Sequence, residues 1–206
     1  MKTSQLNKKF KKATKAQKRV MIAQDVLDQI RAKRYRAVTG KWVDPIWKRD
    51  SESQKIKFTP NHSAKDAFEN KAIDYCKVCA LGGLFMSCTN LNNHTTIENL
   101  DIEASIYLGD YIEFNGKISN GLNKIFSYKQ LQLIESFFEG GEGYFQSHKD
   151  DNYDEEKGIF YESYSNDKRL EIIMQNIIDN DGTFKPNKLN IRKKATNSFT
   201  PTSLTK

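Results

Sequence analysis

The sequence predicts a mainly helical α+β fold: a compact helical domain around a buried central helix, with a small β-hairpin or sheet. The first observation is residues 64–90, which become apolar on nearly every side toward their C-terminal end, as is typical of a helix inside a core. The second is that residues 15–34, 128–139 and 167–180 place apolar side chains at three- and four-residue steps, the pattern of amphipathic helices. The third is a β-prone segment at residues 36–43.

The first 13 residues are rich in lysine. Leu6 and Phe10 are isolated apolar side chains among them, so we expect a flexible basic arm here. Thr14 and Gln17 then form a capping box, which predicts the start of the first helix of the domain. The expected core face of that helix consists of Val20, Ala23, Val26, Leu27 and Ile30.

The β-prone segment at residues 36–43 contains a turn glycine, Gly40, and we expect Asp44-Pro45 to end it. Residues 53–59 alternate polar and apolar side chains. They are the candidate partner strand of a short hairpin.

Ser63 and Asp66 form a capping box that predicts one helix over residues 64–90. The pair Gly82-Gly83 indicates that another helix crosses closely there, or that the helix kinks; the functional alternative is a backbone left bare for a ligand. The unbroken apolar run at residues 78–86 is about half of the roughly 20 residues that a membrane span needs, so we expect no membrane association.

Two further helices are marked by their ends. Ser127 and Gln130 form a capping box, and the helix that follows should end at Gly140. Asn166 is the expected cap of the last helix, and Gly182 the expected C-terminal cap. The expected core faces are Leu131, Ile134, Phe137 and Phe138 in the first of these helices, and Leu170, Ile173, Met174, Ile177 and Ile178 in the second.

The domain organisation follows from these boundaries. We place a single domain over residues 14–186, between the flexible basic arm at 1–13 and a flexible basic tail at 187–206. Residues 102–123 fit either strands or a helix, so their secondary structure stays open. The basic N-terminus is followed by no apolar segment, and we therefore expect no signal peptide.

The cysteines invite a metal or redox interpretation. Cys76, Cys79, Cys88 and His94 stand in the order C-x2-C-x8-C-x5-H. In a continuous helix, Cys79 and Cys88 would lie about 13 Å apart along the axis, too far to share one zinc ion. A thioredoxin-like motif needs a strand before it and a helix after it, whereas a helical pattern precedes Cys76 here. We therefore expect free, buried cysteines, with no metal and no cofactor, in a reducing compartment.

Glu135 and Glu139 lie one turn apart on a predicted helix, where paired carboxylates can bind a metal or perform acid–base chemistry. A solvated or salt-bridged face is the commoner use of such a pair. No phosphate-binding glycine loop, dinucleotide fingerprint or hydrolase nucleophile motif is present. The candidate pocket beside the central helix consists of Trp42, Cys76, Cys79, Glu135 and Glu139.

The net charge of +7 is concentrated at the ends of the chain. Twelve Lys and Arg residues stand among residues 1–36, against Asp25 and Asp28. Basic segments of this kind bind phosphate backbones, or pair with acidic parts of the same chain, or stay solvated. The candidate nucleic-acid contacts are Lys8, Lys9, Lys11, Lys12, Lys15, Lys18 and Arg19.

Five blocks, at residues 18–30, 34–43, 75–87, 125–140 and 167–186, resemble a group of small uncharacterised proteins encoded by bacteriophages and other mobile elements. The most distinctive part is C-x-x-C-A-x-G-x-L-F followed by L-x-L-I-E-x-x-F-E. The resemblance implies a cytoplasmic setting in an infected bacterial host. It carries over no catalytic residue and no cofactor.

Together these observations favour a non-enzymatic phage accessory protein that binds a host component, such as a defence or regulatory factor. Residues 142–165, where aromatic and acidic side chains alternate, are the expected contact surface for a host protein. The alternatives are a nucleic-acid-binding protein that uses its basic termini, and a small-ligand-binding protein or enzyme that uses the candidate pocket. The oligomeric state stays open.

Overall fold

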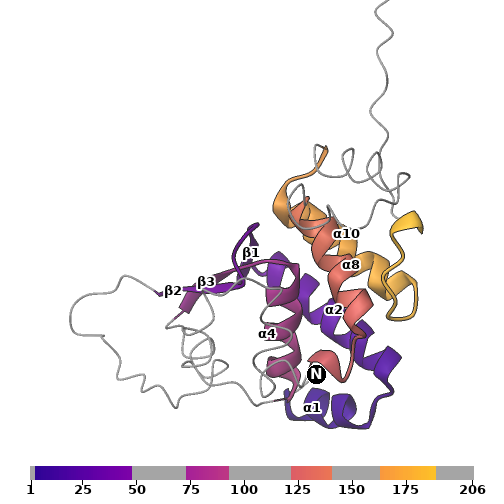
Figure 1. Cartoon of the computed structure of the whole chain (residues 1–206). Helices are drawn as coiled ribbons and strands as arrows, with labels where there is room; N and C mark the ends of the chain where they lie inside the picture. Colours follow the sequence, from indigo (N-terminus) through magenta and orange to yellow (C-terminus); the bar gives the residue numbers. More distant parts are fainter. Residues whose placement is uncertain (1–2, 48–72, 93–121, 141–162, 189–206) are drawn as a thin grey trace, which may run out of the picture.

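The computed structural model describes residues 3–47, 73–92, 122–140 and 163–188 (Figure 1). Over these residues the chain forms a mainly helical α+β fold, as predicted. The helices are α1 (Thr3–Lys12), α2 (Lys15–Arg31), α4 (Ala80–Asn92), α8 (Tyr128–Glu139) and α10 (Asn166–Asp179), with a 3-10 turn, η2 (Pro186–Lys188), near the end. The strands are β1 (Tyr35–Ala37), β2 (Val43–Trp47) and β3 (Ile73–Val78).

The three strands form one sheet with β3 in the middle, parallel to β1 and antiparallel to β2. Helices α2 and α10 pack against β1, and α4 packs against β3. Asp167, in the first turn of α10, accepts the N–H of Ala37 at 2.6 Å and so covers a donor of edge strand β1. The side chains that face the helices are buried: Tyr35, Ala37, Val43, Cys76 and Val78.

The central segment departs from the predicted single helix over 64–90. Residues 73–78 form strand β3, helix α4 begins only at Ala80, and residues 64–72 lie outside the described part. In β3 the buried Cys76 and Val78 alternate with the partly exposed Tyr75 and Lys77, which is the two-residue period of a strand. The same cysteines also fit three- and four-residue steps, and that coincidence produced the wrong prediction.

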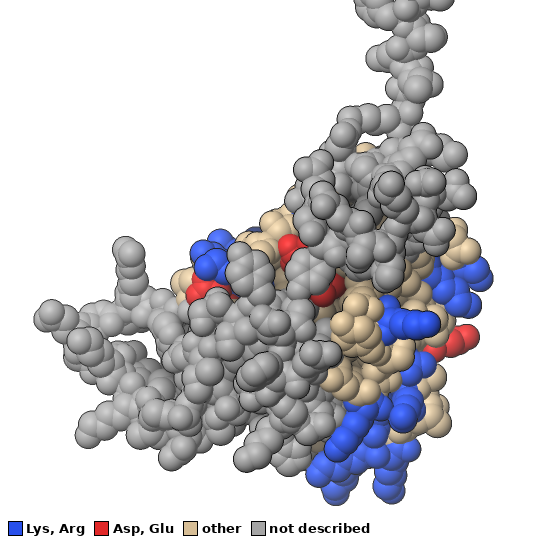
Figure 2. All heavy atoms as spheres, viewed as in Figure 1, with Lys and Arg blue, Asp and Glu red and all other residues tan. Residues whose placement is uncertain are grey.

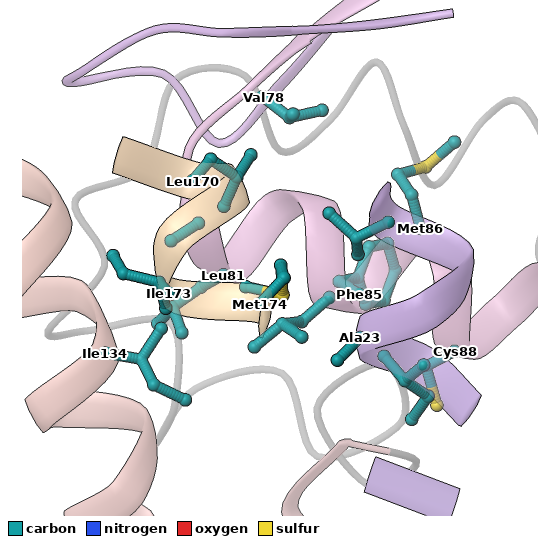
Figure 3. Packing of buried hydrophobic residues seen from close by; sticks show 14 of the residues in the cluster. Ala23, Val78, Leu81, Phe85, Met86, Cys88, Ile134, Leu170, Ile173 and Met174 are labelled. Carbon is teal, nitrogen blue, oxygen red and sulfur yellow. The ribbon is translucent and has the colours of Figure 1, made fainter. Parts of the chain in front are cut away.

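Helix α4 is nevertheless the centre of the core. Its apolar side chains meet those of α2, α8 and α10 (Figure 3). An element apolar on every side is stable only when neighbours cover it all round, and α4 has them. Its buried side chains include Leu81, Leu84, Phe85, Met86, Ser87 and Cys88.

The predicted flexible arm over residues 1–13 is wrong for Thr3–Lys12, which form α1 against α4. Phe10 is only 1% exposed, and Leu6 packs on the same core. These two side chains are four residues apart and therefore share one helix face. Two apolar residues are a weak sequence signal, but burying a Phe is worth about 2 kcal/mol or more.

The predicted helix ends are largely confirmed. Thr14 and Gln17 make the reciprocal capping box that begins α2, and Ser127 accepts the N–H of Gln130 at the start of α8. Gly140 ends α8 with φ 72°. Helix α10 is capped by Ser165 rather than Asn166, and α2 ends at Arg31 rather than near residue 34.

The predicted hairpin also changes. Asp44-Pro45 lies inside β2 rather than ending a strand, and edge strand β2 tolerates a proline that has no N–H. Strand β3 is the partner of both β1 and β2, while residues 53–59 lie outside the described part. Residues 102–121, 142–162 and 189–206 also lie outside it. No described helix is both long enough and apolar enough to cross a membrane.

Candidate functional site

The candidate pocket is partly assembled at the C-terminal end of α8. Glu135 and Glu139 lie on the same side of that helix and both act electrostatically on the thiol of Cys79, the residue just before α4. Glu139 Oε2 accepts the N–H of Gly40, in the turn between β1 and β2, at 2.8 Å. The structure therefore places Cys79, Glu135 and Glu139 near one another.

The two carboxyl groups differ in what surrounds them. Burial, and then the nearby charge of Glu139, raise the pKa of Glu135 to about 8. Burial also raises the pKa of Glu139, but the hydrogen bond from Gly40 and the positive charge of Arg169 both lower it. The pKa of about 8 favours the protonated form of Glu135 at neutral pH.

The other two residues of the candidate pocket do not join this cluster as reactive groups. Cys76 lies in the middle of the sheet, and the charge that acts on it is Asp44 rather than the glutamates. The ring of Trp42 is buried and packs on Phe85, with ring centres 5.4 Å apart. Its backbone carbonyl accepts the N–H of Cys79 at 3.2 Å, so its role here is structural.

Cys76 lies inside β3 and Cys79 lies between β3 and α4, so the C-x-x-C pair is not preceded by a helix, contrary to the sequence interpretation. However, burial raises the pKa of Cys76 to about 12 and raises the pKa of Cys79 well above the usual range of a thiol. Cys79 Sγ also accepts the N–H of Gly82 at 3.3 Å. Reactive cysteines have lowered pKa values and access to solvent, and these two have neither. Within the described residues, no group of three or more His, Cys, Asp or Glu side chains could hold a metal ion.

A second polar cluster, which the sequence did not reveal, lies between α2, α4 and β1. Burial raises the pKa of Asp25, while the Ser87 hydroxyl and the Gln29 amide lower it. Tyr35, 1% exposed, accepts a hydrogen bond from the Asn90 side chain at 3.3 Å. Asp25 falls among apolar positions of α2, and only the packing of α4 against α2 shows that it is enclosed.

The predicted nucleic-acid contacts fall into two groups. Figure 2 shows Lys and Arg side chains gathered over α1 and the beginning of α2, at the lower edge of the molecule. The lysines exposed there are Lys8, Lys9, Lys11, Lys12 and Lys15, which we call the basic face.

Arg19 and Lys18 belong to the fold instead. Arg19 donates from Nε to the carbonyl of Gly182 at 2.5 Å and from Nη1 to the carbonyl of Ile125 at 2.9 Å. Lys18 Nζ lies 5.6 Å from the centre of the Phe10 ring. The prediction of Arg19 as a nucleic-acid contact is therefore corrected, because its guanidinium joins three segments of the protein.

The side of the sheet that faces away from the helices was not predicted from the sequence. There the guanidinium of Arg36 lies 3.8 Å from the centre of the Tyr75 ring. The alternation of residues 74–78 was the signal that would have revealed it.

No protein-family model, curated protein or solved structure was found to match the chain.

Proposed function

We propose that the basic face of this protein binds the phosphate backbone of nucleic acid. One observation carries the proposal: the lysine-rich N-terminus is a helix whose apolar side is buried and whose lysines point outward. Viewed down α1, Lys8, Lys11 and Lys12 fall on the side opposite Leu6 and Phe10, and the exposed Lys9 falls on the flank of the helix.

The basic face is held in place rather than attached loosely. Phe10 anchors α1 in the core, and the carbonyl of Phe10 accepts the N–H of Ala13 at 3.2 Å. Thr14 then caps α2, and Lys18 of α2 lies over the Phe10 ring. Cations on an ordered helix lose less conformational entropy on binding than cations on a random coil do.

Within the part of the chain that the structure describes, no ion pair compensates the charge of the basic face. The sequence contains no acidic residue before Asp25, and the ion pairs within the described residues involve none of the five lysines. Lys8 and Lys12 are four residues apart on one helix, a spacing at which like charges destabilise by a few tenths of a kcal/mol. The helix dipole offsets part of this for the last turn. A bound polyanion would remove the repulsion altogether.

The chemistry of the basic face indicates how it would bind. A lysine ammonium is a compact point charge, which suits a phosphate oxygen but does not distinguish one base from another. Binding through these residues is therefore expected to be independent of sequence and strongly dependent on salt.

The test is fluorescence anisotropy with labelled duplex and single-stranded oligonucleotides at two salt concentrations. Replacing Lys8, Lys9, Lys11 and Lys12 by Gln should weaken duplex binding. It should also reduce the slope of log K against log[salt] by about 3 to 4, because each phosphate contact contributes about 0.9. The matched control replaces four exposed lysines elsewhere by Gln: Lys41, Lys168, Lys185 and Lys188.

Equal losses of nucleic-acid affinity in the two quadruple variants would mean that affinity depends only on the net charge of the protein. The basic face would then not be a specific binding site. An absence of binding by the unaltered protein at low salt would reject the function. A host-protein partner and a phage origin stay predictions from the sequence. Binding of DNA or RNA would not test either of them.

A further inference from the structure

The sheet has a second side, which the helices of the described core do not cover. Side chains on neighbouring strands that stand opposite each other share a face of the sheet, and Arg36 pairs with Lys77 while Ile46 pairs with Tyr75. None of these four side chains is fully buried. We call this side the outer sheet face, and its members are Arg36, Asp44, Ile46, Tyr75 and Lys77.

The centre of the outer sheet face is an aromatic ring with a guanidinium stacked on it. Tyr75 lies on the middle strand, and the exposed Arg36 reaches it diagonally from β1, 3.8 Å from the ring centre. Lys77 stands beside them, 3.9 Å from Asp44 in an ion pair whose side chains are 38% and 31% exposed. An ion pair this exposed is worth under about 1 kcal/mol, so a phosphate can replace Asp44 as the partner of Lys77.

We propose that the outer sheet face is a stacking platform for the unpaired bases of a single-stranded nucleic acid, an inference that rests on the proposed function. Bases stack on aromatic rings and equally on the flat face of an arginine guanidinium. Tyr75 and Arg36 supply both surfaces on neighbouring strands. Lys77 supplies a cation for the phosphate next to the stacked base.

The chemistry favours a single strand over a duplex. In a duplex the faces of the bases are already stacked on one another, and only the edges of the bases are exposed in the grooves. A stacked Arg–Tyr pair reads the face of a base, which is exposed only when the strand is unpaired. The basic face on α1 and the outer sheet face thus have different targets: phosphates in any nucleic acid, and bases in a single strand.

The experiment compares two oligomers with the same number of phosphates, oligo(dT) and an abasic deoxyribose-phosphate strand of equal length. The unaltered protein should bind oligo(dT) more tightly. Tyr75→Leu, which keeps an apolar side chain but removes the ring, should weaken oligo(dT) binding by between about 5-fold and about 150-fold, the range for loss of one stacked base. It should leave binding of the abasic strand unchanged. Tyr75→Phe, which keeps the ring, should retain the preference for oligo(dT).

The failures are distinguishable. Equal affinity of the unaltered protein for the two oligomers overturns the stacking platform and leaves the basic face intact. A preference for oligo(dT) that survives in a folded Tyr75→Leu protein, checked by circular dichroism, also overturns it. No binding of either oligomer, or of duplex DNA, rejects the proposed function and this inference together. The quadruple lysine variant should lose affinity for both oligomers by the same factor, which separates the two faces.

Discussion

Identical side chains on one helix acquire different properties because their neighbours differ. Glu139 is reached by the Gly40 amide and by the charge of Arg169, which both favour its ionised form. Glu135, one turn earlier, has Glu139 and the Cys79 thiol as its neighbours, and burial dominates. Burial raises the pKa of both carboxyl groups, but only at Glu139 do a hydrogen bond and a positive charge oppose that rise.

Ionisation of Glu135 should make stability depend on pH. Its pKa is raised from 4.5 to about 8 by folding. Between these values the folded protein holds a proton that the unfolded chain has released. The free energy of unfolding therefore falls as pH rises from about 5 to about 8, by at most about 1.4 kcal/mol per pH unit, and levels off above that. Glu135→Gln, which resembles the protonated form, should match the unaltered protein at pH 5 and be more stable at pH 8.

Urea denaturation at a series of pH values measures this difference. The exposed-face control is Glu171→Gln, since Glu171 pairs with Lys168 at the surface and should shift stability little at any pH in this range. Glu139 and Asp25 also have raised pKa values and contribute to the slope in both proteins. A Glu135→Gln protein with an unchanged pH profile would show that Glu135 is ionised and solvated in the fold.

At the scale of elements, α4 is packed from both sides, and its two adjacent glycines face different neighbours. A Cβ on Gly82 would overlap the carbonyl oxygen of Trp42 and lie 2.7 Å from its carbonyl carbon. A Cβ on Gly83 would meet side chains of α2, β3 and α10 at ordinary distances of 3.5–3.9 Å. The close approach expected at this glycine pair is real, but the backbone just before β2 makes it, rather than another helix.

Alanine substitutions at these neighbouring positions should therefore have opposite effects. Gly82→Ala forces the backbone of Trp42 away from α4 and should destabilise the protein by about 2 kcal/mol or more. Gly83→Ala removes a helix glycine without a clash and should stabilise it by about 0.5 kcal/mol. Thermal melts of the two single variants provide the comparison. A Gly82→Ala protein at least as stable as the unaltered one would mean that α4 does not approach Trp42 closely.

What the sequence revealed about these elements was local. The caps at Thr14, Ser127 and Gly140 depend on residues within one turn, and the helices they mark were predicted correctly. Strand β3 was missed because a strand is defined by its partners. Tyr35, which pairs with Cys76, is distant from it in sequence, and the residues around Cys76 do not indicate which strand is its partner. The burial of α1 was missed for the same reason. Helix α1 packs against α4, which is distant in sequence.

At the scale of the whole molecule, the functional surfaces depend on contacts that the sequence could not show. Glu135 and Cys79 were both assigned to a candidate pocket beside the central helix, and in the structure the charge of Glu135 acts on the Cys79 thiol. Arg19 was assigned to nucleic acid because it ends a basic run. Its acceptors, Ile125 and Gly182, are 106 and 163 residues away, so only the assembled fold reveals its role.

Arg19→Lys should separate folding from binding. Lysine keeps the positive charge but cannot donate to the carbonyls of Gly182 and Ile125 with the geometry of a guanidinium, so α2 loses its links to the end of α10 and to the turn before α8. Hydrogen bonds from a charged group are worth about 1.5–3 kcal/mol. We expect the free energy of unfolding, measured by urea denaturation, to fall by about 2 kcal/mol, with nucleic-acid affinity unchanged where the variant is fully folded.

Arg31→Lys, at an exposed position of the same helix, is the matched control and should change neither quantity. If Arg19→Lys instead weakened binding at full stability, the guanidinium would contact nucleic acid, and the basic face would extend onto α2.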